Sequence, residues 1–533
     1  MSHTGSDHLH RLVHAMTRAE KRYFKLYTSR HPLPGTSVQQ ALFDAIAALP
    51  AYDQAALERQ FHGQPFMRRF AVTKRRLYEA VLESLDAYHA NNSVDDQLRR
   101  QLHHVEVLHN KALHADAAKM LRSVRTHASQ YGKHALLLQV AEWERRIWER
   151  ANYTDISPLD LEERAKGTGE LAAAWVEVDQ LWQLKSEVFL VLYRCGQAPG
   201  MRELEELNAL ACSPLLAQGT HARSAYAHFL QHHVRSALAY ARNDLQACEA
   251  HLEACAQHVR TEADAFKGEP GLMLGVLGNL AQVRLRLGRH QEALDGFRAF
   301  RKVPLMMAKA PDPDLEMKLF VMAGSLQLAV YTVQGEHIRA MEEVQCLEAG
   351  MARFGERLSP VRRAELALQA AYVALGAGQA DQALRWCNRL LNEKGIAAHV
   401  ELHALGRMVN VMCLVELGKH DLLAYLVRNA QRALKQHGSP YAMERILLAH
   451  AHALAACTGQ PRKPGSWPTL LAELEQAATD PKEAALLDQI DLVAWCRANT
   501  EGRAFHVLLR ERWLAATAAG GTLPKNCGRN KAA

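Results

Sequence analysis

The amino-acid sequence predicts an all-α fold, in which a small N-terminal helical domain precedes a superhelix (solenoid) of stacked helical hairpins. Three observations predict it. Ala, Leu, Arg, Gln and Glu dominate the composition, whereas runs rich in Val, Ile and Thr, which favour strands, are scarce. The chain has 533 residues, which exceeds one compact core but suits several domains or one long solenoid. A short pattern of residues also recurs along most of the chain, every 40 to 47 residues where it is clearest.

The recurring pattern begins at a residue that can end a helix. Gly288 is followed by Ala293 five positions later and by Phe297 nine positions later. Gly or Asn supplies the left-handed conformation that ends one helix, the small residue lets the next helix approach, and the apolar residue lies one turn further on the same face. One such hairpin cannot bury its apolar face alone, so the units must stack. The other copies begin at Ala112, Asn243, Gly335, Gly378 and Gly418.

This pattern resembles the tetratricopeptide repeat (TPR) family. That family has a small residue seven positions before the Gly, an Ala five after it, a bulky residue nine after it, and often a Pro that closes the unit. Leu328 and Val411 stand where a small residue is expected, and the family's usual period is only about 34 residues. The resemblance covers residues 98–500 and is clearest over 270–435; the offsets are lost over 150–240 and again after Gly459. The matching residues are Ala281, Gly288, Ala293, Phe297 and Pro304 in one unit, and Ala371, Gly378 and Ala383 in another.

Residues 1–92 lack the repeat and are expected to form a separate domain of four helices. Capping-box patterns at Thr17–Glu20 and Ser37–Gln40 predict the starts of the first two helices. Asp53 predicts the cap of a short third helix, and a fourth is expected from Phe70 to His89. A short helix before a basic one resembles a helix-turn-helix arrangement. The fourth helix should bury one face, made by Leu77, Val81, Leu85 and Tyr88.

The same N-terminal part, read together with the degenerate repeats, also resembles a group of bacterial TPR-containing proteins without an assigned activity. That resemblance supports the domain layout and implies no function.

Two basic clusters in this domain suggest contacts with phosphate groups, because cations hold phosphates and aromatic rings stack on bases. The first places Lys21, Arg22 and Lys25 among aromatic residues, and the alternative is that those aromatics form the buried face of a helix. The second has no acid within it, and the alternative there is that Arg75 pairs with Glu79. The net charge of +7 is mild for this length and permits nucleic acid without requiring it. The second cluster comprises Arg68, Arg69, Lys74, Arg75 and Arg76.

No motif for catalysis, cofactor binding or metal binding is evident, so we expect neither an enzyme nor a cofactor. The GxG at Gly167–Gly169 lies in an Ala-rich helical setting with no strand before it, which is not a dinucleotide loop. Two histidine pairs, His228 with His232 and His399 with His403, have the spacing of two ligands on one helix face. A metal needs a third ligand, which the sequence does not identify, so no metal site is expected.

The cysteine content and hydropathy favour a cytoplasmic protein. None of the ten cysteines forms a CxxC pair, and a reducing compartment fits that usage. No stretch approaches 18 uninterrupted apolar residues, and the N-terminus has no leader pattern, so we expect no membrane association. Residues 518–533 are expected to form a disordered basic tail.

The leading hypothesis is a scaffold that binds a peptide or helix of another protein in the concave groove of the superhelix. The alternative is a regulator of transcription or RNA that joins a nucleic-acid-binding N-terminal domain to a TPR-like sensor domain. For Met408 and Met412, packing between repeats is an equal alternative to partner contact. The sequence predicts no oligomeric state. The groove residues that the resemblance implies are Gln282, Arg286, Ser325, Thr332, Tyr372, Met408, Met412 and Glu416.

Overall fold

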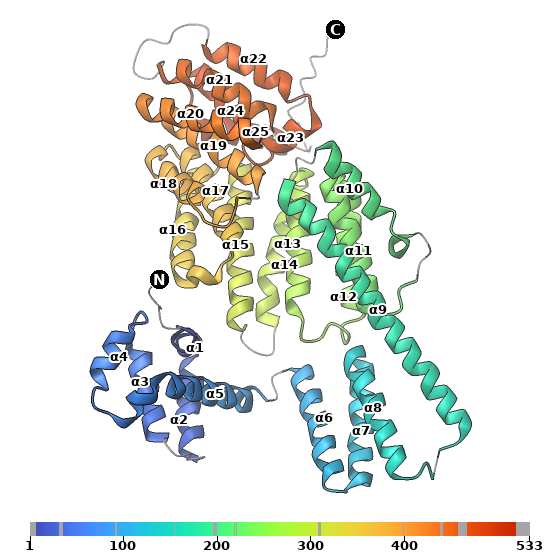
Figure 1. Ribbon diagram of the computed structural model, residues 1–533. Helices are drawn as coiled ribbons and strands as arrows, with labels where there is room; N and C mark the ends of the chain where they lie inside the picture. Colours follow the sequence, from blue (N-terminus) through green and yellow to red (C-terminus); the bar gives the residue numbers. More distant parts are fainter. Residues whose placement is uncertain are drawn as a thin grey trace. The chain divides into compact units, whose positions relative to one another are not determined.

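Helices make up all the regular secondary structure in the part of the chain that the computed structural model describes (Figure 1). The predicted all-α fold is therefore confirmed. No helix among these residues is both long enough and apolar enough to pass through a lipid bilayer. The structure describes residues 7–30, 36–90, 93–154, 156–195, 200–217, 219, 221–306, 311–397, 399–437, 441–456 and 466–518.

The chain folds as two compact units, residues 1–168 and 169–533. The boundary falls within α9 (Pro158–Cys195), a single helix of 38 residues. In the first unit, five helices with their own core precede three helices that begin the hairpin pattern; the remaining hairpins belong to the second unit.

The first ninety residues form helices around an apolar core in which Phe24, Phe43 and Leu77 are buried. The capping box at Thr17 and Glu20 is confirmed, because each backbone N–H donates to the other residue's side chain, at 2.6 and 3.2 Å. Asp53 also caps its helix as predicted, accepting from the N–H of Ala56 at 3.0 Å. The helices are α1 (His8–Ala15), α2 (Arg18–Arg30), α3 (Thr36–Ala48), α4 (Gln54–Gln60) and α5 (Phe70–His89).

Three predictions for this region were wrong. Ser37 does not cap a helix, because α3 already begins at Thr36; Gln40 instead donates to the Thr28 hydroxyl on α2 at 2.8 Å. The helix α1 was missed, since it begins without any side-chain cap. Tyr88 is 40% exposed, although its ring lies 5.1 Å from that of Tyr23.

Most helices from α6 onward pack against the next one as hairpins, and from α13 to α21 the first helices of neighbouring units also pack together. In the first unit these are α6 (Val94–Asn110), α7 (His114–Gln130) and α8 (His134–Arg150). In the second unit the pairs are α11 (Ala225–Ala241) with α12 (Leu245–Thr261), α13 (Pro270–Arg286) with α14 (His290–Lys302), α15 (Pro313–Gln334) with α16 (His337–Phe354), α17 (Pro360–Gly376) with α18 (Ala380–Leu391), α19 (Val400–Glu416) with α20 (His420–His437), and α21 (Ala442–Ala456) with α22 (Ser466–Ala477).

The six residues predicted to end the first helix of each hairpin all have positive φ. Gly335, for example, has φ of 69°, and the next N–H, that of Glu336, donates to the Tyr331 carbonyl at 2.9 Å. This is the hydrogen bond of a Schellman motif, which satisfies a carbonyl that the helix leaves free. The other five φ values are 62° at Ala112, 57° at Asn243, 76° at Gly288, 75° at Gly378 and 62° at Gly418.

The predicted packing positions are buried as well. The small residues Ala293, Ala340 and Ala383 are at most 1% exposed, which allows the second helix to approach the first closely. Leu328 and Val411, which stand where the TPR pattern has a small residue, are also buried. The degenerate positions therefore serve the same inter-helix packing with larger side chains.

The stretches without the repeat pattern contain helices of other lengths. Over 150–240 the long α9 passes through Gly167 and Gly169 without a break, and the short α10 (Met201–Ala211) follows. Beyond residue 459 come α23 (Pro481–Leu487), α24 (Leu492–Glu501) and α25 (Phe505–Ala518). Residues 196–199 and 457–465 lie outside the described residues, as does the predicted tail after Ala518.

We expect Gly335→Ala to destabilise the second unit more than Gly378→Ala does. Both glycines have positive φ, which costs any other residue about 1–2 kcal/mol. A Cβ at Gly378 would meet no atom within 4 Å, whereas at Gly335 it would overlap the backbone of Arg510 on α25. Thermal unfolding followed by circular dichroism measures the difference. Equal midpoints for the two variants would show that α25 does not approach this turn.

Candidate partner-binding surfaces

The eight residues assigned to the groove lie on the first helices of four consecutive units, α13, α15, α17 and α19. Gln282 is exposed, and Thr332 is half-buried. Ser325 is half-buried and accepts a hydrogen bond from the Gln369 amide at 2.9 Å. These three residues retain surface that a partner could contact.

Three other groove residues contact the chain's own C-terminal segment, residues 481–518. The Arg286 guanidinium lies 3.1 Å from a carboxylate oxygen of Asp488. The Tyr372 hydroxyl accepts from the backbone N–H of Asp491 at 2.8 Å. Glu416 accepts hydrogen bonds from the Trp495 indole N–H at 2.8 Å and from the Asn499 amide at 3.1 Å. Both donors lie further along the same segment.

Met408 and Met412 lie in the apolar core of the second unit, at 1% and 0% exposure. They pack between units, which is the alternative considered from the sequence. Their assignment to a partner surface is therefore corrected: the first helix of this unit is surrounded by neighbouring helices, so little of it faces solvent.

The last helix of this segment, α25, crosses three successive turns of the stack. We call the surface that these turns form the turn edge; it consists of His290, Gly335, Glu336, His337 and Gly376. The Trp513 ring lies 4.3 Å from the His290 ring, at the first turn. At the second, Arg510 donates to the Gln334 carbonyl at 3.2 Å and pairs with Glu336 at 3.0 Å.

At the third turn of this edge, His506 lies 3.1 Å from the Gly376 carbonyl oxygen. The Phe505 ring lies 5.9 Å from the ring of His337, which belongs to the second turn. His506, Arg510 and Trp513 are three or four positions apart, so they share one face of α25. Basic side chains meet the free carbonyls at the ends of α15 and α17, where a helix favours positive charge.

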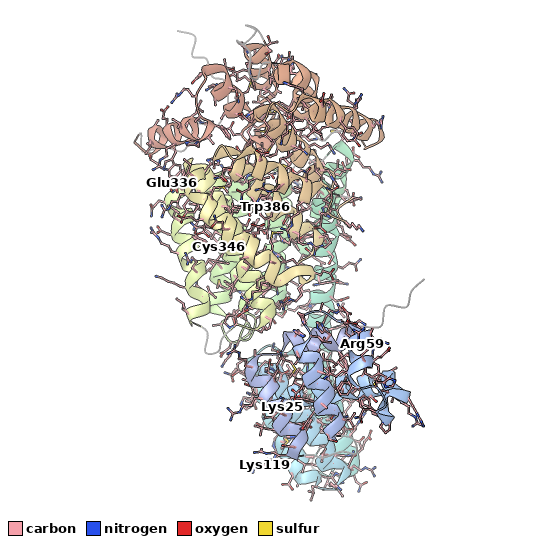
Figure 2. The ribbon with its side chains drawn as sticks, turned by 90° about the vertical axis from the view of Figure 1, so that its left-hand side faces the viewer. Lys25, Arg59, Lys119, Glu336, Cys346 and Trp386 are labelled. Carbon is pink, nitrogen blue, oxygen red and sulfur yellow. The ribbon has the colours of Figure 1, made fainter. Side chains whose placement is uncertain are left out.

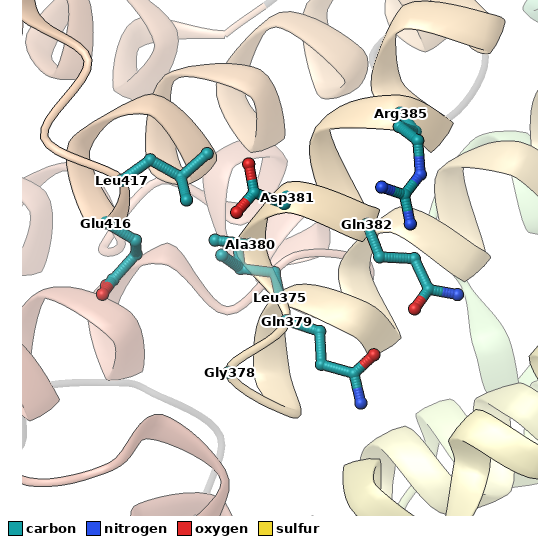
Figure 3. A pocket seen from close by; sticks show the side chains of 9 residues that line it. All are labelled: Leu375, Gly378, Gln379, Ala380, Asp381, Gln382, Arg385, Glu416 and Leu417. Carbon is teal, nitrogen blue, oxygen red and sulfur yellow. The ribbon is translucent and has the colours of Figure 1, made fainter.

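A cavity of about 370 Å³ lies beside this region, between the end of α17, the start of α18 and the end of α19. Figure 3 shows Gln382 and Arg385 of α18 on one side and Glu416 on the other. Asp381 in its wall already pairs with Lys419 at 2.9 Å. The lining offers polar contacts to a partner side chain but no constellation for catalysis.

The basic cluster of the N-terminal domain is divided by the structure. Arg68, Arg69 and Arg76 are exposed, and among the described residues none of them has an ion pair. Arg75 pairs with Glu79 at 2.9 Å, as the alternative predicted. Lys74 is half-buried, and its ammonium donates to the Tyr52 hydroxyl at 2.8 Å, so it is not free to hold a phosphate.

The aromatic residues of α2 follow the alternative prediction. Phe24 is buried, and Tyr23 and Tyr27 are half-buried. Lys25, labelled in Figure 2, pairs with Asp44 of α3 at 2.7 Å. This cluster is therefore mainly the packed face of a helix.

The structure brings the His228–His232 pair next to two histidines of α12. The Nδ1 atoms of His232 and His251 are 3.2 Å apart, and the His228 and His258 rings lie 4.3 Å apart. Within the described part of the chain, no group of three or more His, Cys, Asp or Glu is arranged to hold a metal ion. Burial, together with the nearby His228 and His251, lowers the pKa of His232 to about 4.

A second histidine pattern was overlooked in the sequence. In several hairpins, a His stands two positions after the residue with positive φ that ends the preceding helix. Burial lowers the pKa of His337, one of these histidines, to about 4, and lowers that of His290 and His134. A neutral imidazole suits this position, because the first turn of a helix disfavours positive charge. Five helices begin in this way, at His114, His134, His290, His337 and His420.

Comparison with known proteins gives no family assignment. No protein-family model matches the chain, and no curated protein matches it. Among solved structures, a similar chain is the "Crystal Structure of P58(IPK) TPR Domain at 2.5 A", at 11% identity and a TM-score of 0.19 over 76% of this chain and 100% of that one. The helical-repeat architecture follows from this chain's own helix pairs and turns.

We expect the stability of the second unit to fall as the pH drops from about 6.5 towards 4. A histidine whose folded pKa lies below its unfolded value of 6.5 stabilises the fold above pH 6.5, and this contribution is lost as protons bind. Since one pKa unit corresponds to about 1.4 kcal/mol, His337 alone accounts for about 3 kcal/mol at most. The thermal midpoint, measured across this range, should vary less in His337→Met than in the unmodified protein.

The matched control for this experiment is His62→Met, at an exposed position of the N-terminal domain. It should leave the pH dependence unchanged. A pH profile that is identical in His337→Met and in the unmodified protein would contradict the role assigned to the buried imidazole.

Proposed function

We propose that this protein is a helical-repeat scaffold that binds another protein, and that it is not an enzyme. The observation that carries the proposal is the seating of α25 on the turn edge. There a helix is held by aromatic anchors, Phe505 and Trp513, and by basic side chains on helix-end carbonyls. A stack that accepts one helix in this way has the chemistry to accept others.

The groove formed by the first helices is the proposed site for a peptide or helix of the partner. Gln282, Ser325 and Thr332 lie along it with their side chains at least partly accessible. Stacked hairpins offer such a surface over several units at once, which suits an extended ligand. We place this activity in the cytoplasm, which agrees with the free thiols of cysteines such as Cys248, Cys346 and Cys413.

We expect affinity capture with the full chain to recover specific proteins that survive nuclease treatment. Charged side chains introduced along the groove, in Gln282→Arg with Thr332→Arg, should remove those proteins, because they block apolar and hydrogen-bonding contacts there. The control pair, Gln291→Arg with Gln345→Arg, changes exposed residues of the second helices α14 and α16. Mass spectrometry reads the result. Recovery of the same proteins by both double variants would reject the groove as the binding site.

A second candidate is a regulator whose N-terminal domain binds nucleic acid. The observation in its favour is the set of three exposed arginines without ion pairs, Arg68, Arg69 and Arg76. They lie close together in sequence, at the start of α5 and in the 3-10 turn Pro65–Arg69 before it. Unpaired guanidinium groups bind phosphates without displacing an existing carboxylate.

If this candidate holds, reversing the three charges with Glu should abolish binding of labelled DNA or RNA. Three phosphate contacts correspond to a slope of about −3 in a plot of log affinity against log salt concentration. The control reverses three exposed charges on or near α7, at Lys111, Lys119 and Arg122; Lys119 is labelled in Figure 2. Fluorescence anisotropy measures both. Equal losses in both triple variants would mean that net charge, not this cluster, drives binding.

A further inference from the structure

The long helix α9 has two different faces within the second unit. One face packs into an apolar core through Leu181, Val188 and Val191, all fully buried. The opposite face carries large apolar side chains in solvent, which we name the α9 stripe. Its members, with their exposed fractions, are Trp175 at 47%, Trp182 at 54%, Leu190 at 64% and Tyr193 at 47%.

The spacing of the stripe matches the helical period. Trp175 and Trp182 are seven residues apart, two helical turns, and Leu190 and Tyr193 continue the same side. Taking about 200 Å² for one aromatic side chain, the three rings alone leave about 300 Å² exposed. This approaches the size of the largest apolar patches on soluble monomers, and Trp and Tyr are the residues that most often anchor interfaces.

The two edges of the stripe differ in charge. Asp179, Gln183 and Glu187, each four residues apart, follow one edge, and Glu187 accepts a hydrogen bond from Gln183 at 3.0 Å. On the other side the Lys185 ammonium lies 5.9 Å from the centre of the Trp182 ring. Lys185 is half-buried, and this burial lowers its pKa, so little of its charge is offered to a partner. The accessible edge is therefore the acidic one.

The stripe also has a defined end. The Tyr193 ring meets the His399 ring edge-on, with centroids 6.3 Å apart, just before α19 begins. From Trp175 to this contact, α9 rises by about 27 Å at 1.5 Å per residue. An occupant of matching length is a helix of about five turns.

We propose that the α9 stripe binds an amphipathic helix of a protein partner. Its apolar face lies on Trp175, Trp182 and Leu190, and its basic side chains lie beside Asp179 and Glu187. This proposal rests on the scaffold function and names a site for it, separate from the groove of α13 to α19.

Two other occupants fit the charges less well. A second copy of this chain, paired antiparallel about a two-fold axis, would bring the acidic edges of both copies together. An anionic membrane surface would be repelled by Asp179 and Glu187. A partner helix with basic flanks meets neither obstacle.

The test uses the full chain and two synthetic helical peptides of 20 residues labelled with fluorescein. Both carry Leu on one face; one has Lys on the flanks and the other has Glu. We expect the Lys peptide to bind at least about tenfold more tightly than the Glu peptide, by fluorescence anisotropy. Trp175→Ala with Trp182→Ala should weaken binding of the Lys peptide by about tenfold or more. Asp179→Lys with Glu187→Lys should reverse the preference between the peptides.

The matched control is Leu422→Ala with Tyr425→Ala on α20, where the two side chains are exposed to a similar degree, 52% and 61%. It should bind the Lys peptide as the unmodified protein does. The proposal is overturned if the tryptophan variant binds the Lys peptide normally, or if the unmodified protein binds neither peptide. It is also overturned if light scattering shows a dimer that is lost in the tryptophan variant. The same holds if the unmodified protein binds phosphatidylserine vesicles and the tryptophan variant does not. Such results would leave the capture experiment on the groove, and so the scaffold function, unaffected.

Discussion

The hairpins from α11 to α20 depend on the left-handed residue that ends the first helix of each. That residue reverses the direction of the chain within three positions. The N–H that follows it can then donate to a carbonyl in the last turn of the helix, as the N–H of Glu336 after Gly335 does. The second helix then begins at a fixed rotation, so the small side chain five residues on faces the first helix. Without this geometry, Ala340 and its counterparts could not be buried, and neighbouring units would lose the surfaces on which they stack.

Helix ends impose the second constraint, because each leaves backbone groups without partners. In the C-terminal part of the chain, distant residues satisfy them. The buried Glu483 carboxylate accepts from the N–H groups of Ala442 and Met443 at the start of α21, at 2.6 and 3.1 Å. Arg510 and His506 serve the opposite ends of α15 and α17. The C-terminal helices thus complete the hydrogen bonding of earlier units.

Local features of the sequence predicted most of the fold. Turn residues, caps and the offsets to Ala293 or Phe297 act within about ten positions, and the sequence carries them directly. The helical setting expected around Gly167 was correct, because the surrounding Ala, Leu and Glu favour helix strongly enough to include two glycines in α9. Helix α1 escaped notice for the opposite reason: it has no capping signal.

The candidate sites were predicted less well, since they depend on which residues meet across long separations. The positions of Tyr372 and Glu416 on their helices followed from the repeat pattern, but no pattern indicated that Asp491 and Trp495 would contact them. The α9 stripe was hidden for a similar reason. Trp175 and Trp182 have the spacing of a buried face, and only the packing of Leu181 and Val188 shows which face is buried.

The position of α25 on the turn edge also affects how the chain matures. Arg510 meets Gln334 and Glu336 across more than 170 residues, so a stack otherwise built from neighbours acquires a contact that closes late. During synthesis, the units from α13 to α18 can form their hairpins as they emerge, but their turns stay uncovered until α25 has left the ribosome. The turns in the middle of the stack are therefore covered only after α25 has been made.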